Sequence, residues 1–177
     1  MPPDEATPVV DMANGLAGGC QCGAVRYRVT SAPFGVHVCH CRMCQKAVGG
    51  PFAVICPVLK ADFSITRGEM SHFWSSDVAR RGFCGRCGTP MTFEYPDAED
   101  LGLLVGTFDH PELIAPEIQY GIESRLPWCA GLPRLPGDRP TYADDPVMLE
   151  RISRSGHQHP DHDTDIWLFH LHEAPHE

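Results

Sequence analysis

The 177-residue chain has few basic residues and no long apolar run, and each shortage argues against a class of partner. Lysine and arginine total 14 against 23 aspartates and glutamates, which gives a formal net charge of −9 at pH 7. A nucleic-acid-binding surface normally needs many lysines and arginines, so we expect no nucleic-acid partner. No apolar run approaches the ~20 residues of a membrane span, so we expect no membrane partner either.

A secretory signal is also missing from the first residues. Met1 to Gly15 is rich in proline and acidic residues and lacks a basic start followed by an apolar stretch. We therefore expect a cytoplasmic protein, in a reducing compartment where disulfides are rare. The hydrophobic content of 42% is enough for one packed domain with appendages.

Cysteine is abundant instead. Seven of the nine cysteines fall into three tight clusters: Cys20-x-Cys22, Cys39-x-Cys41-x2-Cys44 and Cys84-x2-Cys87. An odd count and a chain longer than the usual stapled domain argue against a disulfide scaffold. Thiolates one to three residues apart converge well on a soft cation such as zinc. The isolated Cys56 and Cys129 are interpreted as small buried hydrophobic residues.

Counting ligands predicts two unequal zinc sites, one closed by four sulfurs and one open with three. A closed set usually stabilises structure, whereas an open fourth position usually supports chemistry. Spacing alone does not fix which clusters pair. The simplest four-ligand set combines the two two-cysteine clusters, which leaves Cys39, Cys41 and Cys44 for the second site. Gly23, Gly85 and Gly88 fit sharp turns whose N–H groups point at sulfur.

The hydrophobic pattern predicts a mainly antiparallel β domain of short strands. Val25, Tyr27 and Val29 alternate along residues 24–30 and should share one face. Further strand-like runs cover residues 52–58, 63–66, 71–74, 91–95 and 101–107, with one helical turn at 42–47. We divide the chain into a flexible arm (1–15), a zinc-binding domain (16–132) and a C-terminal extension (133–177).

The C-terminal extension begins as a Pro/Gly/Asp-rich linker, continues as a possible short helix over 147–154, and ends in a histidine-rich segment. His157, His159 and His162 are candidate ligands of an accessory metal site. We favour the alternative interpretation of a solvated polar tail. In that interpretation, the Ile166-Trp167-Leu168-Phe169 segment docks on the domain.

The cysteine clusters and their flanking residues resemble one family. Gly19-Cys20-Gln21-Cys22-Gly23, Cys39-His40-Cys41-Arg42-Met43-Cys44 and Phe83-Cys84-Gly85-Arg86-Cys87-Gly88-Thr89-Pro90 are similar, in order and spacing, to motifs of the glutathione-dependent formaldehyde-activating enzymes, a family that includes relatives of centromere protein V. The resemblance covers roughly residues 18–132. It implies a β-tent fold of small antiparallel sheets, a structural zinc at Cys20, Cys22, Cys84 and Cys87, and a catalytic zinc at Cys39, Cys41 and Cys44.

The activity that this resemblance implies is that of a carbon–sulfur lyase similar to S-(hydroxymethyl)glutathione synthase. A zinc-activated thiol, glutathione or a similar one, would add to formaldehyde or another small aldehyde. His40 lies between two ligands, but alternate residues of an extended segment point in opposite directions, so we favour a packed or ligand-supporting His40 over a catalytic one. Glu117-Ile118-Gln119-Tyr120 replaces a histidine-aromatic stretch of many relatives, which leaves the substrate pocket undetermined.

Two further hypotheses concern the second zinc. A fourth ligand such as His40, Cys56 or a tail histidine would close the site and make the domain a non-catalytic two-zinc binding or scaffold module; metal-free cysteine chemistry is a weaker option. In the enzyme hypothesis, basic residues near the clusters, Lys46 or Arg81, hold the carboxylates of an anionic thiol such as glutathione.

Overall fold

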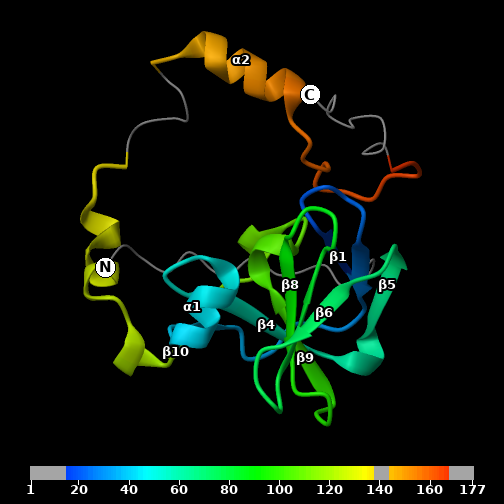
Figure 1. Cartoon of the computed structure of the whole chain (residues 1–177), viewed down its shortest axis with the longest axis vertical. Helices are drawn as coiled ribbons and strands as arrows, with labels where there is room; N and C mark the ends of the chain where they lie inside the picture. The colour runs from blue at the N-terminus through cyan, green and yellow to red at the C-terminus, as the bar shows by residue number, and fades with distance from the viewer. Residues whose placement is uncertain (1–14, 138–143, 168–177) are drawn as a thin grey trace.

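The protein, as a computed structural model, is described over residues 15–137 and 144–167. These residues form two β-sheets, two α-helices and several short 3-10 turns (Figure 1). The strands are β1 (Leu16–Gly19), β2 (Arg26–Val29), β3 (His37–Cys39), β4 (Ala53–Leu59), β5 (Phe63–Arg67), β6 (Ser71–Trp74), β7 (Arg80–Phe83), β8 (Pro90–Glu94), β9 (Asp100–Leu104) and β10 (Ile118–Tyr120). The helices are α1 (Arg42–Val48) and α2 (Pro146–Ser155).

The predicted mainly β, antiparallel fold is confirmed. A three-stranded sheet has the order β1-β2-β5, and a seven-stranded sheet has the order β10-β3-β4-β9-β8-β7-β6. In these two sheets every strand pair is antiparallel except β10 with β3, which run parallel. One edge strand of the larger sheet is therefore β10, which contains the residues that stand in place of the histidine-aromatic stretch of many relatives.

The main hydrophobic core contains buried residues of both sheets. Val25, Tyr27 and Val29 are buried side by side, as their alternation predicts. They share one cluster with Cys56 and Val58 of β4. The Tyr27 hydroxyl is paired within this core, 2.9 Å from the Thr107 hydroxyl. The one strongly polar atom of the Tyr27 side chain is thus satisfied at full burial.

Strand β4 is apolar on both faces, because the larger sheet is covered on both sides. Cys56 and Val58 face the main core. Ala53 and Ile55 belong to a second cluster with Cys44 on α1 and Leu104 on β9. The cysteine-bearing helix is therefore packed on the opposite side of the larger sheet from the main core.

Helix α1 is longer than the predicted turn and has a defined start and end. The Cys41 sulfur caps its N-terminus by accepting a hydrogen bond from the Cys44 N–H, 3.4 Å away. Gly49 ends it in the left-handed conformation at φ 65°. The cap ties two of the clustered cysteines to the same first turn.

Four strands were not predicted: β1, β3, β7 and β10. The predicted run over residues 101–107 divides into β9 and a 3-10 turn at Val105–Thr107. The expected helix in the extension exists as α2, and none of its residues is buried. The N-terminal arm through residue 14 lies outside the described residues, and the domain boundaries stay a prediction. Within the described ranges, no helix is long and apolar enough to cross a membrane.

Candidate metal centres

The structure brings four thiols together from two distant parts of the chain. Cys20 and Cys22 follow β1, while Cys84 and Cys87 lie in the turn between β7 and β8, and their four sulfurs are within 4.8 Å of one another. The Cys20 and Cys22 sulfurs are 3.6 Å apart, and those of Cys22 and Cys84 are 3.9 Å apart. A tetrahedral ion with metal–sulfur bonds of about 2.3 Å separates its sulfurs by about 3.8 Å. The cluster therefore fits a zinc-sized ion.

Two glycines shape the turns around this cluster. Gly23 and Gly88 adopt φ of 73° and 76°, a region that side chains other than glycine rarely occupy. Gly85 does not need positive φ, so only two of the three predicted glycine positions have this conformation. The Val25 N–H donates to the Cys20 sulfur over 3.3 Å. Such N–H···S bonds favour the thiolate form that binds metal.

Three thiols of the four-cysteine cluster, those of Cys20, Cys22 and Cys87, have shifted pKa values. Burial raises the pKa of Cys20 strongly and that of Cys22 to about 11. Burial also opposes ionisation of Cys87, but hydrogen bonds from Thr89 and nearby groups outweigh it and lower the Cys87 pKa to about 6. Several adjacent thiolates need a cation to neutralise their charge, which supports a metal site here.

The C-terminal segment covers this four-cysteine cluster. The chain after α2 runs beside the loop that carries Cys20 and Cys22 (Figure 1), where the His159 N–H donates to the Gln21 carbonyl over 2.7 Å. The Trp167 indole N–H donates to the Cys22 carbonyl over 2.8 Å. The Arg86 guanidinium lies 4.5 Å from the Trp167 ring centroid. The expected docking of this segment is confirmed as far as Trp167; Leu168 and Phe169 lie outside the described residues.

Ion pairs fasten the same segment to the small sheet. Asp163 accepts from Arg26 over 2.8 Å and from Arg28 over 2.7 Å. Arg26 is buried and also pairs with Asp109 over 2.6 Å. Docking therefore neutralises part of a buried cation, since each guanidinium has several donors to satisfy.

The histidines of this segment make no metal cluster among the described residues. His157, His159 and His162 are absent from the groups whose ligand atoms converge. The His159 ring instead contacts Arg67, Thr164 and the Pro160 carbonyl. The candidate accessory metal site is therefore not formed by these three residues, in agreement with the favoured interpretation of a polar tail. His170, His172 and His176 lie outside the described residues.

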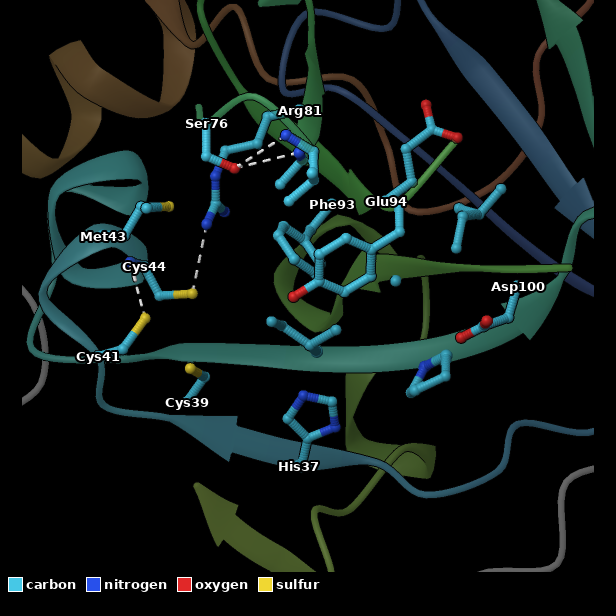
Figure 2. Close-up of a pocket in the computed structure, with 17 residues that line it drawn as sticks. His37, Cys39, Cys41, Met43, Cys44, Ser76, Arg81, Phe93, Glu94 and Asp100 are labelled. Atoms are coloured by element: carbon cyan, nitrogen blue, oxygen red, sulfur yellow. Dashed lines mark hydrogen bonds between the residues drawn. The ribbon is translucent and has the colours of Figure 1, made fainter. Parts of the chain in front are cut away.

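The other three clustered cysteines form a second group on one short segment. Cys39 ends β3, Cys41 caps α1 and Cys44 lies in its first turn, and their sulfurs are within 4.8 Å of one another. Figure 2 shows these thiols together at one end of a cavity. The structure thus divides the seven clustered cysteines into four and three, as ligand counting and the resemblance propose.

The cavity beside the three thiols has a volume of about 550 Å³. Its walls come from β4, β8 and β9 and from the loop between β6 and β7, and they include Ile55, Pro57, Val78, Phe93 and Leu101. His37 also lines it, two residues before Cys39 on the same strand. Sequence analysis missed these residues, although the two-residue period of a strand places His37 on the Cys39 face.

Among the described residues that line this cavity, Arg81 is the one with a permanently positive side chain. Its guanidinium donates to the Cys44 sulfur over 3.4 Å and lies 4.8 Å from the Phe93 ring centroid. Figure 2 shows it at the thiol end, with Asp100 at the other end. Lys46 is exposed on α1 and does not line the cavity. Of the two proposed anion-binding residues, Arg81 alone reaches the site.

Cys39 and Cys41 differ in their readiness to ionise. Burial raises the pKa of Cys39 to about 12. Burial acts the same way on Cys41, but the N–H of Cys44 and the neighbouring thiols outweigh it and leave the Cys41 pKa below its ordinary value. Cys41 therefore becomes a thiolate more readily than Cys39.

His40 faces away from the cavity. Its Nε2 lies 2.8 Å from the Gln119 side-chain oxygen, and its ring packs edge-on against Phe52. Its backbone N–H donates to the Tyr120 carbonyl over 2.9 Å. The favoured interpretation of a packed His40 agrees with these contacts. Residues 117–120, which stand in place of the histidine-aromatic stretch, thus support the segment that carries the three cysteines through the contacts of β10 with His40.

Neither isolated cysteine adds a ligand. Cys56 is fully buried in the main core, and Cys129 is half-buried in a 3-10 helix at Pro127–Arg134. All nine cysteines are free thiols. Among the residues that the structure describes, the three-thiol group has no fourth protein ligand within reach.

Fold and clusters together define a mainly β protein with two candidate metal centres, one closed and one open. Comparison with known proteins gives the family: the model of the glutathione-dependent formaldehyde-activating enzymes matches residues 15–124, more than half of the chain. The chain therefore belongs to this family, as its motifs indicate.

The similarity of the chain to individual relatives is modest in sequence identity. A putative glutathione-dependent formaldehyde-activating enzyme of Halomonas elongata is 33% identical over 84 residues, covering 43% of this chain and 54% of the relative. An uncharacterized lyase of Schizosaccharomyces pombe is 29% identical over 84 residues, covering 47% of this chain and 60% of the relative. A crystal structure of a Rhodobacter sphaeroides protein is 21% identical, with a TM-score of 0.48, and covers 58% of this chain and 98% of that one. The chain spans little more than half the length of the two curated relatives.

Proposed function

We propose that the protein is a zinc-dependent carbon–sulfur lyase that works in the synthetic direction and joins a thiol to a small aldehyde. The thiol is glutathione or a similar molecule, and the aldehyde is formaldehyde or a larger relative. One observation carries the proposal: three thiols converge at the end of a cavity of about 550 Å³, without a fourth ligand among the described residues. Family membership supports the same chemistry.

The two clusters have different roles in this proposal. Cys20, Cys22, Cys84 and Cys87 would hold a structural zinc, because their sulfurs are mostly buried and spaced for tetrahedral coordination. Cys39, Cys41 and Cys44 would hold the second zinc. When bound there, zinc would supply an open position at which a thiol loses its proton near neutral pH.

The protein's own residues prepare the reaction. Arg81 places a fixed positive charge 3.4 Å from the Cys44 sulfur and so offsets the negative charge that gathers among the thiolates. The apolar residues of the neighbouring walls lower the local polarity, which strengthens that charge interaction. His40 and Gln119 hold the ligand segment in place from the far side.

The test compares catalysed and spontaneous rates, because glutathione and aldehydes also combine without help. Wild type should speed formation of the adduct above this background, and Cys41→Ser should not. Cys129→Ser is the matched control, since Cys129 lies outside both clusters, and it should behave as wild type. A wild-type rate equal to the background would contradict the enzyme hypothesis and favour the two-zinc scaffold.

A further inference from the structure

The cavity is far larger and more apolar than formaldehyde requires. A water molecule occupies about 30 Å³ of liquid, and formaldehyde, with two heavy atoms, needs on the order of twice that. The cavity measures about 550 Å³. Beyond the thiols its walls are formed by Ile55, Pro57, Val78, Phe93, Tyr95 and Leu101. Apolar walls of this extent stabilise a bound ligand only if an apolar group of that ligand is buried against them.

The charges of the cavity beyond its thiol end argue against an anionic group on the aldehyde. Glu94 lines it but is already paired, with Arg80 over 2.7 Å and with Lys60 over 3.4 Å. Asp100 adds a second carboxylate at the end away from the thiols (Figure 2). Arg81 is the one lysine or arginine among the described lining residues. A carboxylate carried by the aldehyde into the space beyond Arg81 would therefore meet carboxylates and hydrocarbon.

The Nε–H of Arg81 is a buried donor that is available to a substrate. The Arg81 side chain is 4% exposed, and its Nε–H has no hydrogen-bond partner among the described residues. A buried donor without an acceptor is costly, and a carbonyl oxygen is a suitable acceptor. The same guanidinium touches the Cys44 sulfur, so an oxygen bound by Arg81 would lie at the thiol end of the cavity.

We propose that the preferred aldehyde carries an apolar chain or ring, which lies against the Val78–Phe93–Leu101 wall while Arg81 binds the carbonyl oxygen. This inference rests on the proposed function and specifies its carbonyl substrate. The thiol sulfur forms a bond to the carbonyl carbon, and the C=O π electrons move to the oxygen beside Arg81. That oxygen then gains one proton, and the thiol has given one up, so the product is a hemithioacetal and no oxidant or reductant is consumed.

The experiment measures how the catalysed rate changes with aldehyde length. Glutathione is held constant, and formaldehyde, acetaldehyde, propanal and butanal are compared, with each rate divided by the spontaneous rate of the same pair. Exchange NMR between aldehyde and adduct gives both rates. Each methylene buried against the wall should raise the catalysed kcat/KM about fourfold, so butanal should exceed acetaldehyde about 15-fold.

Two pairs of variants separate the role of the wall from that of the guanidinium. Val78 is 65% exposed in a loop whose Val78 and Ala79 N–H groups donate to the Ser76 hydroxyl, so Val78→Asp should fold normally and flatten the dependence on chain length. Val147→Asp makes the same change at an exposed position of α2 away from the cavity and should leave the dependence intact. Arg81→Met should lower the rates of all four aldehydes by a similar factor, and Arg81→Lys should restore part of them.

Each outcome decides a separate question. The inference is supported if the ratio of catalysed to spontaneous rate rises with aldehyde length in wild type and in Val147→Asp, but not in Val78→Asp. If formaldehyde is accelerated and longer aldehydes are accelerated equally or less, the inference is wrong and the proposed function stands. If no aldehyde reacts faster than the background, the proposed function fails and the inference fails with it.

Discussion

The two cysteine clusters differ in how they are built into the chain. The four-thiol cluster joins a loop near residue 20 to a turn near residue 85, and the C-terminal segment covers it. The three-thiol cluster lies within six consecutive residues and opens on a cavity. Closing the longer loop removes more chain entropy, by about 2 kcal/mol. The first cluster should therefore govern stability, and the second should be dispensable for the fold but required for activity.

Removing one ligand of the four-thiol cluster should have the largest effect. Cys84→Ser should abolish zinc binding at this site and unfold the domain. The metal contributes on the order of 10 kcal/mol in such sites, which is comparable to the whole stability of a typical domain. Metal analysis and thermal melts measure both results. Cys129→Ser serves as control, and a chain that keeps its melting point after zinc is stripped would refute a structural role.

The equivalent change in the three-thiol cluster should separate structure from activity. Cys41→Ser should shift the melting temperature by a few degrees at most, because serine is itself a good helix cap and can replace the Cys41 sulfur at the start of α1. Adduct formation should fall about 100-fold or more, since the open site loses a ligand. Melts and rates are measured on the same preparation. Unfolding as severe as that of Cys84→Ser would show that the two clusters do not have separate roles.

Weakening the C-terminal cover should affect only the four-thiol site. Trp167→Ala removes the hydrogen bond to the Cys22 carbonyl and the contact with Arg86. Together these contribute on the order of 2 kcal/mol, so zinc should leave this site roughly tenfold faster or more. Transfer of zinc to a coloured chelator measures the rate, and Trp128→Ala, at an exposed tryptophan outside the C-terminal segment, is the control. Equal release from wild type and Trp167→Ala would show that the cover does not hold the metal.

The smallest expected effect is the pH dependence of docking of the C-terminal segment. Burial, followed by the charges of Arg26 and Arg67, lowers the pKa of His159 below its ordinary 6.5. The docked segment therefore binds fewer protons than the undocked one. Docking should be strongest above pH 6.5 and should weaken as the pH falls from 6.5 through the lowered pKa. Limited proteolysis between pH 7.5 and 5.5 measures docking, and His159→Gln should remove the change in this range.

Sequence patterns predicted the strands with clear alternation or long apolar runs, such as β2 and β4. The strands β3, β7 and β10 have only three or four residues each and include polar or charged positions such as His37 and Arg80. Their pairing partners are supplied by the rest of the sheet, which no local pattern reveals. The three cysteine clusters were predictable because ligand spacing within each is local, whereas the pairing of the two distant clusters followed from ligand counting and the family resemblance. The contact between Arg81 and Cys44 joins residues far apart in the chain and needed the folded sheet.

The central claim is that the three-thiol site accepts an external thiol, whereas the four-thiol site does not. Cobalt substituted for zinc tests this directly, because its visible absorption bands change with the first coordination shell. Glutathione should shift the bands of wild type but not those of Cys41→Ser, and S-methylglutathione, whose sulfur cannot become a thiolate, should cause a far smaller shift. Equal shifts with both compounds, or none with either, would contradict the account and leave the protein as a two-metal binding domain.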